Sequence, residues 1–157
     1  MTEDSRETDV SALLLRLGLG VVFAVHGFGK LDIGPLANGA GVSGVTGFFT
    51  QLGIPLPGIM AWIVTLVEVV GGLLLLLGVF TRVASLLLAV DMAVATVLVH
   101  LPNGFGVGDG GVEFTLVLFL GVLALVFLGP GRYSLEVVVL GRELVPSLGE
   151  ETLGRSV

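Results

Sequence analysis

The sequence predicts an all-α protein of the membrane, a polytopic four-helix bundle. Of its 157 residues, 54% are hydrophobic and only 13% are charged, and the mean hydropathy is +1.06. Soluble domains carry about 25% charged residues, so this composition excludes an ordinary soluble domain. Crossing about 30 Å of hydrocarbon takes roughly 20 apolar residues in a helix. Four stretches meet that need, namely residues 12–31, 58–80, 84–102 and 113–129.

Residues that typically begin or end helices lie at the boundaries of these spans. Pro55 and Pro57 precede the second span, Pro102 closes the third, and Gly129 and Pro130 follow the fourth. Proline lacks the amide proton that a helix interior needs, and glycine favours the left-handed backbone found just after a helix. The chain therefore divides into an acidic cytoplasmic tail, a four-span membrane domain and a cytoplasmic C-terminal tail. Their boundaries are 1–11, 12–131 and 132–157.

Two shorter segments with one apolar face lie outside the spans. Between the first and second spans, Val45, Phe48, Phe49 and Leu52 recur at the spacing of one helix face. This pattern predicts a short helix that lies in the membrane interface and covers the bundle, or a loop whose aromatic rings anchor at the headgroups. In the C-terminal tail, residues 134–145 mix apolar and charged residues and predict a second interfacial segment.

The distribution of basic residues predicts the orientation of the bundle. An even number of spans places both termini on one side of the membrane. Basic residues gather in cytoplasmic loops, so we expect both termini in the cytoplasm of a multi-pass plasma-membrane protein. Lys30 is the single basic residue on the opposite side. The residues on the side of the termini are Arg6, Arg16, Arg82, Arg132, Arg142 and Arg155.

Five ionisable residues lie in the outer half of the predicted bundle. Glu68 is about ten residues, or roughly 15 Å, from the outer end of its span. His26 and Lys30 lie near the outer end of the first span, His100 ends the third, and Glu113 begins the fourth. A charge at the centre of a bilayer costs about 2.5–3.5 kcal/mol on insertion scales, so such residues face the bundle interior and find partners. If all five face inward, they form one polar pocket.

Two glycines indicate that Glu68 lies at a contact between helices. Gly71 and Gly72 follow it by three and four residues and share its face. Small residues let a second membrane helix approach closely. Glu68 is therefore either a functional group in the pocket or a buried residue that only locks the packing.

A second pair of charged residues lies in the inner half of the bundle. Arg16 is about one turn inside the membrane and Asp91 about two turns, so we expect them to form a structural ion pair. Asp91 and His100 are nine residues apart. On an ideal helix that separation places them on opposite faces, so Asp91 is not expected in the outer pocket.

The outer residues favour proton-coupled binding of a small oxygenated molecule. Histidine and glutamate can exchange protons with a quinone or phenol oxygen, while apolar walls hold its ring. The same donors suit zinc or non-haem iron, but no span carries a Glu-x-x-His pair, so no metal is predicted. The sequence contains no cysteine, which excludes disulfides and thiolate chemistry. It shows no flavin, haem or nucleic-acid-binding signature.

Several motifs together resemble the DoxX family over about residues 13–135. They are His26-Gly27-Phe28-Gly29-Lys30-Leu31, the glycine-containing run from Glu68 to Thr81-Arg82, and His100-Leu101-Pro102-Asn103-Gly104-Phe105. The positions that match the family are Arg16, His26, Lys30, Glu68, Arg82, His100 and Glu113. Asp91 belongs to none of these motifs. The resemblance implies a four-helix integral membrane protein and a link to membrane redox complexes, because the family is related to a subunit of a thiosulfate:quinone oxidoreductase.

We therefore expect a redox-associated subunit of a quinone-linked membrane oxidoreductase, with a quinone-like ligand in the outer pocket. Glu68 and His26 would be the catalytic residues that handle protons, and Lys30, His100 and Glu113 would bind the ligand. The partners would be the lipid bilayer and an electron-transfer protein, and a homo-oligomer is compatible with the sequence. Two alternatives stay open: a non-catalytic membrane scaffold, and a small-solute or proton-coupled transporter.

Overall fold

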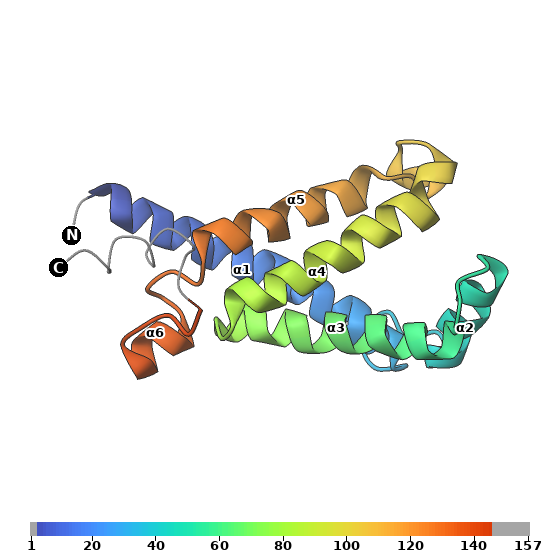
Figure 1. The fold of residues 1–157 in the computed structure, drawn as a ribbon, viewed down its shortest axis with the longest axis horizontal. Helices are drawn as coiled ribbons and strands as arrows, with labels where there is room; N and C mark the ends of the chain where they lie inside the picture. The colour runs from blue at the N-terminus through green and yellow to red at the C-terminus, as the bar shows by residue number, and fades with distance from the viewer. Residues whose placement is uncertain (1–2, 146–157) are drawn as a thin grey trace.

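Four helices lying lengthwise form the body of the molecule in the computed structural model, which describes residues 3–145 (Figure 1). No strand occurs within this range, so the all-α prediction is confirmed. The four helices are α1 (Glu3–Lys30), α3 (Pro57–Leu77), α4 (Thr81–Ala95) and α5 (Glu113–Leu128). The shorter elements are α2 (Gly41–Gln51), the π turn η1 (Thr96–His100), the 3-10 turns η2 (Leu101–Asn103) and η3 (Val107–Asp109), and α6 (Leu135–Leu140).

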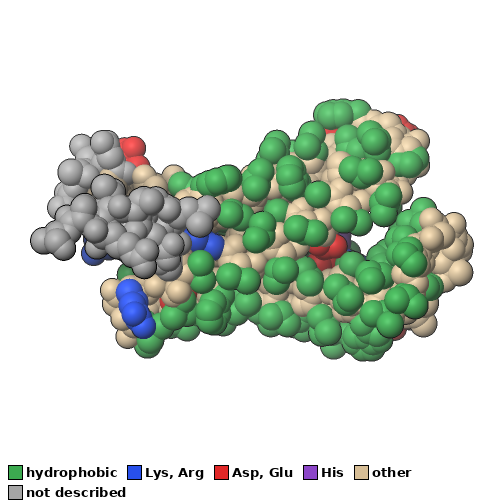
Figure 2. Space-filling view, in the orientation of Figure 1, with side chains coloured by type: hydrophobic (Ala, Val, Ile, Leu, Met, Phe, Trp, Pro, Cys, Tyr) green, Lys and Arg blue, Asp and Glu red, His purple; other side chains and the backbone are tan. Residues whose placement is uncertain are grey.

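The helices have the length and composition of a membrane bundle. Three segments of the described chain are long and apolar enough to cross a membrane, namely Ser5–Lys30, Pro57–Leu77 and Thr81–Asn103. The fourth predicted span corresponds to α5, which is apolar but has only 16 residues. Large apolar side chains such as Leu73, Val90 and Leu120 are exposed. Figure 2 shows hydrophobic side chains spread over the helical body. The predicted helical membrane bundle is confirmed.

The four helices form two pairs that meet at one end and separate at the other. α1 packs mainly against α3, and α4 mainly against α5. In Figure 1 the two pairs diverge towards the end that carries α2, while α6 and the start of α1 lie at the other end. The buried core lies where the pairs meet and includes Phe23, Leu75, Leu88, Val122 and Leu125.

Glycines bring α1 and α3 into contact along their backbones. A Cβ on Gly72 would lie 2.5 Å from the backbone nitrogen of Ala24 in α1. A Cβ on Gly27 would lie 2.6 Å from the backbone nitrogen of Val69 in α3. Gly71 instead faces α4, where its Cβ would lie 3.0 Å from a side-chain carbon of Leu88. The predicted close approach of a helix beside Glu68 is confirmed, and Gly72 is the glycine that meets backbone.

Arg16 binds backbone carbonyls at the joined end of the bundle and is only 1% exposed. Its Nε donates to the carbonyl of Leu75 at 3.0 Å, and its Nη1 donates to that of Pro130 at 2.5 Å. Both Nη atoms lie 3.4 Å from the carbonyl of Tyr133. The last carbonyls of a helix lack their usual partners within it, so a guanidinium at the end of α3 adds a charged donor to the carbonyl of Leu75, which otherwise accepts only from the backbone of Gly78 at 3.2 Å.

The expected ion pair between Arg16 and Asp91 is therefore wrong. The two residues lie at similar depths, but α1 makes its main contacts with α3 and α5, whereas Asp91 belongs to α4. Depth along a membrane helix does not say which neighbour that helix faces.

Arg82 plays the corresponding part at the end of α5. Its Nη1 donates to the carbonyls of Val126 and Phe127 at 2.6 and 2.8 Å, and its Nη2 lies 3.2 Å from Glu143 Oε2. Nearby, the carboxylate of Glu136 in α6 accepts a hydrogen bond from the backbone of Phe80 at 3.1 Å. Burial raises the pKa of Glu136, and hydrogen bonds from backbone amides oppose this effect. α6 thus ties the predicted C-terminal segment to the turn between α3 and α4, and its interfacial location stays a prediction.

We expect Gly72→Ala to destabilise the fold more than Gly71→Ala. The methyl group at residue 72 meets backbone and can be accommodated only if α1 and α3 move apart, whereas Leu88 can shift its side chain away from residue 71. Overpacking of a core costs about 1–3 kcal/mol, and we expect the cost at residue 71 to stay below about 1 kcal/mol. Thermal unfolding in detergent, followed by circular dichroism, measures the difference. Equal losses of Tm would contradict the assigned contacts.

We expect Arg16→Leu to lower the free energy of unfolding by more than about 2 kcal/mol, because it leaves buried carbonyls without their charged donor. Arg6→Leu is the control, since Arg6 is exposed near the start of α1, and surface changes stay within about 0.5 kcal/mol. The measurement is unfolding in detergent at several temperatures. An Arg16→Leu protein as stable as the control would show that the carbonyl contacts contribute nothing.

The orientation of the bundle stays a prediction that single cysteines can test, because the natural chain has none. Glu7 and Gln51 are exposed and lie near opposite ends of the bundle. With the termini in the cytoplasm, a membrane-impermeant maleimide should label Gln51→Cys in intact spheroplasts and should label Glu7→Cys only after lysis. Labelling of Glu7→Cys before lysis would reverse the orientation.

Candidate functional site

A cavity of about 630 Å³ lies between the two helix pairs at the end where they separate. All four long helices contribute to its walls, together with α2, the π turn and the loop between α1 and α2. Most of the lining is apolar, and it includes Phe23, Phe48, Phe49 and Phe114. Figure 2 shows the hollow at this end of the molecule, with charged atoms visible where it meets the bundle.

The helix α2 covers one side of this cavity. Val45, Phe48 and Phe49 line the cavity, as the apolar face of the predicted segment suggested, whereas Leu52 is not among the lining residues. The prediction of a helix here is confirmed. None of its residues is fully buried, so α2 rests on the bundle without entering the core. Its place in the membrane interface stays a prediction.

Lys30 and Glu68 form an ion pair in the wall made by α1 and α3. The Lys30 ammonium donates to Glu68 Oε2. The side chain of Glu68 is 6% exposed and that of Lys30 is 23% exposed. Gly27 precedes Lys30 by about one turn, and its close approach to α3 sets Lys30 over Glu68. A buried charge is tolerated when an opposite charge pairs with it, which explains how a carboxylate persists in the middle of an apolar helix.

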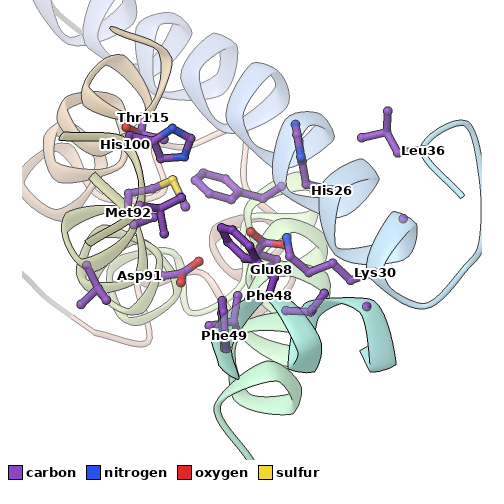
Figure 3. Close-up of a pocket in the computed structure, with 18 of the residues that line it drawn as sticks. His26, Lys30, Leu36, Phe48, Phe49, Glu68, Asp91, Met92, His100 and Thr115 are labelled. Carbon is purple, nitrogen blue, oxygen red and sulfur yellow. The ribbon is translucent and has the colours of Figure 1, made fainter. Parts of the chain in front are cut away.

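Both histidines line the same cavity, on different sides of it (Figure 3). The ring of His26, on α1, lies 6.2 Å from the ring of Phe114. His100, at the end of the π turn, has its Nδ1 2.7 Å from the carbonyl oxygen of Gly110. Because a carbonyl only accepts hydrogen bonds, Nδ1 of His100 carries the proton, and Nε2 remains for a second interaction.

Asp91 also lines the cavity, contrary to the expectation that it points away from His100. Its side chain extends from α4 towards Glu68 and Lys30 (Figure 3). The π turn explains the difference, because it takes up one residue more than an α turn. The separation from His100 then corresponds to about eight residues of a regular helix, or about 80° around its axis. The two residues therefore share a side.

The first residue of the π turn, Thr96, forms hydrogen bonds with both α4 and α5. The Thr96 hydroxyl donates to the carbonyl of Met92 at 2.7 Å and lies 3.0 Å from the hydroxyl of Thr115 in α5. Pro102, two residues beyond the turn, has no amide proton to offer the carbonyl of Leu98. That proline is the one feature of the sequence that signals an irregular helix here.

Glu113 lies outside the cavity lining, so its expected place in the pocket is wrong. It is the first residue of α5, and its Oε2 accepts a hydrogen bond from the backbone of Val107 at 3.0 Å. The carboxylate thereby closes the loop before α5 and lies at the positive end of the helix dipole. Its level along the bundle was estimated correctly, but the loop holds its side chain.

The structure thus brings together four of the five outer residues predicted to share a pocket, His26, Lys30, Glu68 and His100, and adds Asp91. Within residues 3–145, no group of three or more histidines, aspartates or glutamates is placed to hold a metal ion. The site combines an ion pair, a further carboxyl group and two imidazoles with aromatic walls. This arrangement can bind a flat apolar molecule and exchange hydrogen bonds with its polar atoms.

Comparison with known proteins places these residues in a family. The DoxX family model matches residues 11–101, a range that holds the four predicted residues of the cavity and Asp91. The Bacillus subtilis protein CatD, whose name presents it as a candidate oxidoreductase, is 30% identical over 132 residues, covering 84% of this chain and 89% of its own. An uncharacterized membrane protein of Mycobacterium tuberculosis is 35% identical over 140 residues, covering 80% of this chain and 79% of its own.

The inner membrane protein YqjF of Escherichia coli is 31% identical over 130 residues, covering 82% of this chain and 91% of its own. No solved structure matches the chain. The membrane location of the relatives agrees with the apolar helices described above.

Proposed function

The chain belongs to the DoxX family of multi-pass plasma-membrane proteins, and we propose that it is a redox-associated subunit that binds a quinone-like molecule in its cavity. The observation that carries the proposal is the Lys30–Glu68 ion pair in the wall of a cavity that is otherwise mainly apolar. A site built of apolar walls and a few convergent polar groups is typical of small-molecule binding.

The cavity fits the chemistry of a quinone. A quinone ring is flat and apolar, and its two carbonyl oxygens accept hydrogen bonds. Phe23, Phe48 and Phe49 supply aromatic walls, and Lys30 supplies a charged donor. The volume of about 630 Å³ falls within the range of about 300–1,000 Å³ that ligand sites occupy.

The polar residues suit the handling of protons. A quinone takes up two electrons and two protons when it is reduced to a hydroquinone, and in this proposal the electrons come from an electron-transfer protein. Glu68 can hold or release a proton next to the ring oxygen, with Lys30 compensating its charge. His26, which is exposed, can pass protons between Glu68 and the surroundings. The name of CatD, a candidate oxidoreductase, supports a redox role.

The distribution of charged residues favours ligand binding over a purely structural scaffold. Arg16 and Arg82 bind backbone carbonyls at the joined end, as charges that stabilise packing would. Lys30, Glu68 and His26 instead line an open cavity at the other end. Residues that served packing alone would not need a hollow of this volume beside them.

We expect Glu68→Gln to lose the bound quinone while the matched variant Glu113→Gln keeps it. The glutamine at residue 68 leaves the Lys30 ammonium unpaired in an apolar wall, and it cannot exchange a proton. Glu113→Gln makes the same chemical change outside the cavity, where glutamine still accepts the hydrogen bond from Val107. The measurement is mass spectrometry of the lipids that copurify with each protein in mild detergent. Wild type should carry near-stoichiometric quinone, and Glu68→Gln about a tenth of that amount, which requires a Kd about a hundredfold higher, equivalent to about 2.8 kcal/mol.

Two results would contradict the proposal. One is a wild-type protein that neither retains quinone nor takes it up when quinone is added. The other is a Glu68→Gln protein that keeps its quinone but has a lower Tm than wild type, which would make Glu68 a packing residue and favour the scaffold.

A further inference from the structure

We propose that Asp91 is a second ligand-binding residue, and that the ligand is a flat ring with oxygen atoms at opposite ends, held between Asp91 and the Lys30–Glu68 pair. This inference rests on the proposed function, because it assumes that the quinone-like molecule occupies the cavity. It adds a residue outside the motifs that carry the family resemblance, and a specific requirement on the ligand.

The first support is the arrangement of polar groups across the cavity. Lys30 and Glu68 belong to the α1–α3 pair of helices, whereas Asp91 belongs to the α4–α5 pair. Figure 3 shows the carboxyl group of Asp91 directed across the cavity towards Glu68. Between these polar groups the lining is apolar and includes Phe23 and Met92. A ligand that spans the cavity therefore meets polar groups at two ends and apolar groups along its length.

The second support is that Asp91 has an unsatisfied oxygen. Its Oδ2 is buried and has no hydrogen-bond partner among the described residues. The other buried charged residues of the bundle are paired: Arg16 with backbone carbonyls, Glu68 with Lys30, and Glu136 with the amide of Phe80. A buried polar atom without a hydrogen-bond partner costs free energy. Because Asp91 lines the cavity, a polar atom of the ligand can supply the missing hydrogen bond.

The third support is the chemistry of the carboxyl group. A protonated carboxyl group donates a hydrogen bond, and an ionised one accepts. Asp91 can therefore bind a ring carbonyl or a ring hydroxyl, the two forms of oxygen that a quinone and its hydroquinone present. Lys30 and Glu68 together offer a donor and an acceptor at the opposite wall. A ring with a single oxygen can form hydrogen bonds at one wall only, and it leaves the polar groups of the opposite wall without a ligand partner.

The test compares two ring probes that differ by one hydroxyl group, tetramethylhydroquinone and 2,3,5,6-tetramethylphenol. Equilibrium dialysis with the full chain in detergent micelles, under reducing conditions, gives the Kd of each probe after partition into protein-free micelles is subtracted. Wild type should bind the hydroquinone about tenfold more tightly than the phenol, as one hydrogen bond to a carboxyl group allows. Asp91→Leu should weaken the hydroquinone alone and bring the two Kd values together.

Two further variants separate ligand binding from folding. Asp91→Asn is isosteric and can still form a hydrogen bond, so it should keep a preference for the hydroquinone above that of Asp91→Leu. Asp109→Leu makes the same chemical change at an exposed residue outside the cavity, and it should keep the wild-type ratio. A Tm measurement on each variant confirms that binding is compared between folded proteins.

The outcomes distinguish this inference from the proposed function. If wild type binds neither probe and no quinone, the proposed function fails, and this inference fails with it. If wild type binds both probes with equal Kd, or if Asp91→Leu keeps the wild-type preference, Asp91 is not a ligand-binding residue, and quinone binding beside Lys30 and Glu68 stands.

Discussion

The backbone contact between α1 and α3 is the constraint on which the site depends. Membrane helices gain little from burying apolar side chains against each other, because lipid is just as apolar, so close packing and polar contacts fix their positions. Here Gly27 and Gly72 allow the two backbones to touch. The contact at Gly27 lies directly beside Glu68, and Lys30 follows by about one turn. With wider spacing between the helices, the lysine and the glutamate could not pair in the same wall.

The two ends of the bundle use charge in different ways. At the joined end, Arg16 and Arg82 bind carbonyls at the ends of α3 and α5, and α6 packs against the turn between α3 and α4. These contacts hold the two pairs of helices together where α3 turns into α4. At the other end the pairs separate, and charged and polar residues line the space between them. The cavity thus follows from the fold, since helices fastened at one end and inclined to each other must enclose space at the other.

Sequence reasoning predicted the helices and most of the polar residues of the site. Long apolar runs and punctuating prolines indicate spans directly, and a charged residue within such a run must face inward. Depth could therefore be calculated from the helical rise, and it correctly grouped His26, Lys30, Glu68 and His100. The helix α1 extends beyond the predicted first span, back to Glu3, because the acidic residues before the apolar run continue the helix.

Two of the errors share one physical origin, which is that depth carries no information about direction around the bundle. Arg16 and Asp91 share a depth but face different helices, and Glu113 shares the level of the cavity but is held by its loop. For Asp91 the rule of 100° per residue failed because of the π turn. Pro102 is the one local signal of that turn, and the contact between Thr96 in the turn and Thr115 in α5 cannot be read from a local pattern.

The π turn also bears on how chains of this family diverge. It holds one residue more than a regular helix needs between Asp91 and His100. A descendant that lost a single residue within Thr96–His100 could revert to an unbroken α-helix without changing the rest of the bundle. The face beyond the deletion would rotate, and the histidine and the carboxyl group would no longer share one side. A one-residue gap at this place in an alignment would therefore mark a change in the composition of the cavity even where every side chain around it is retained.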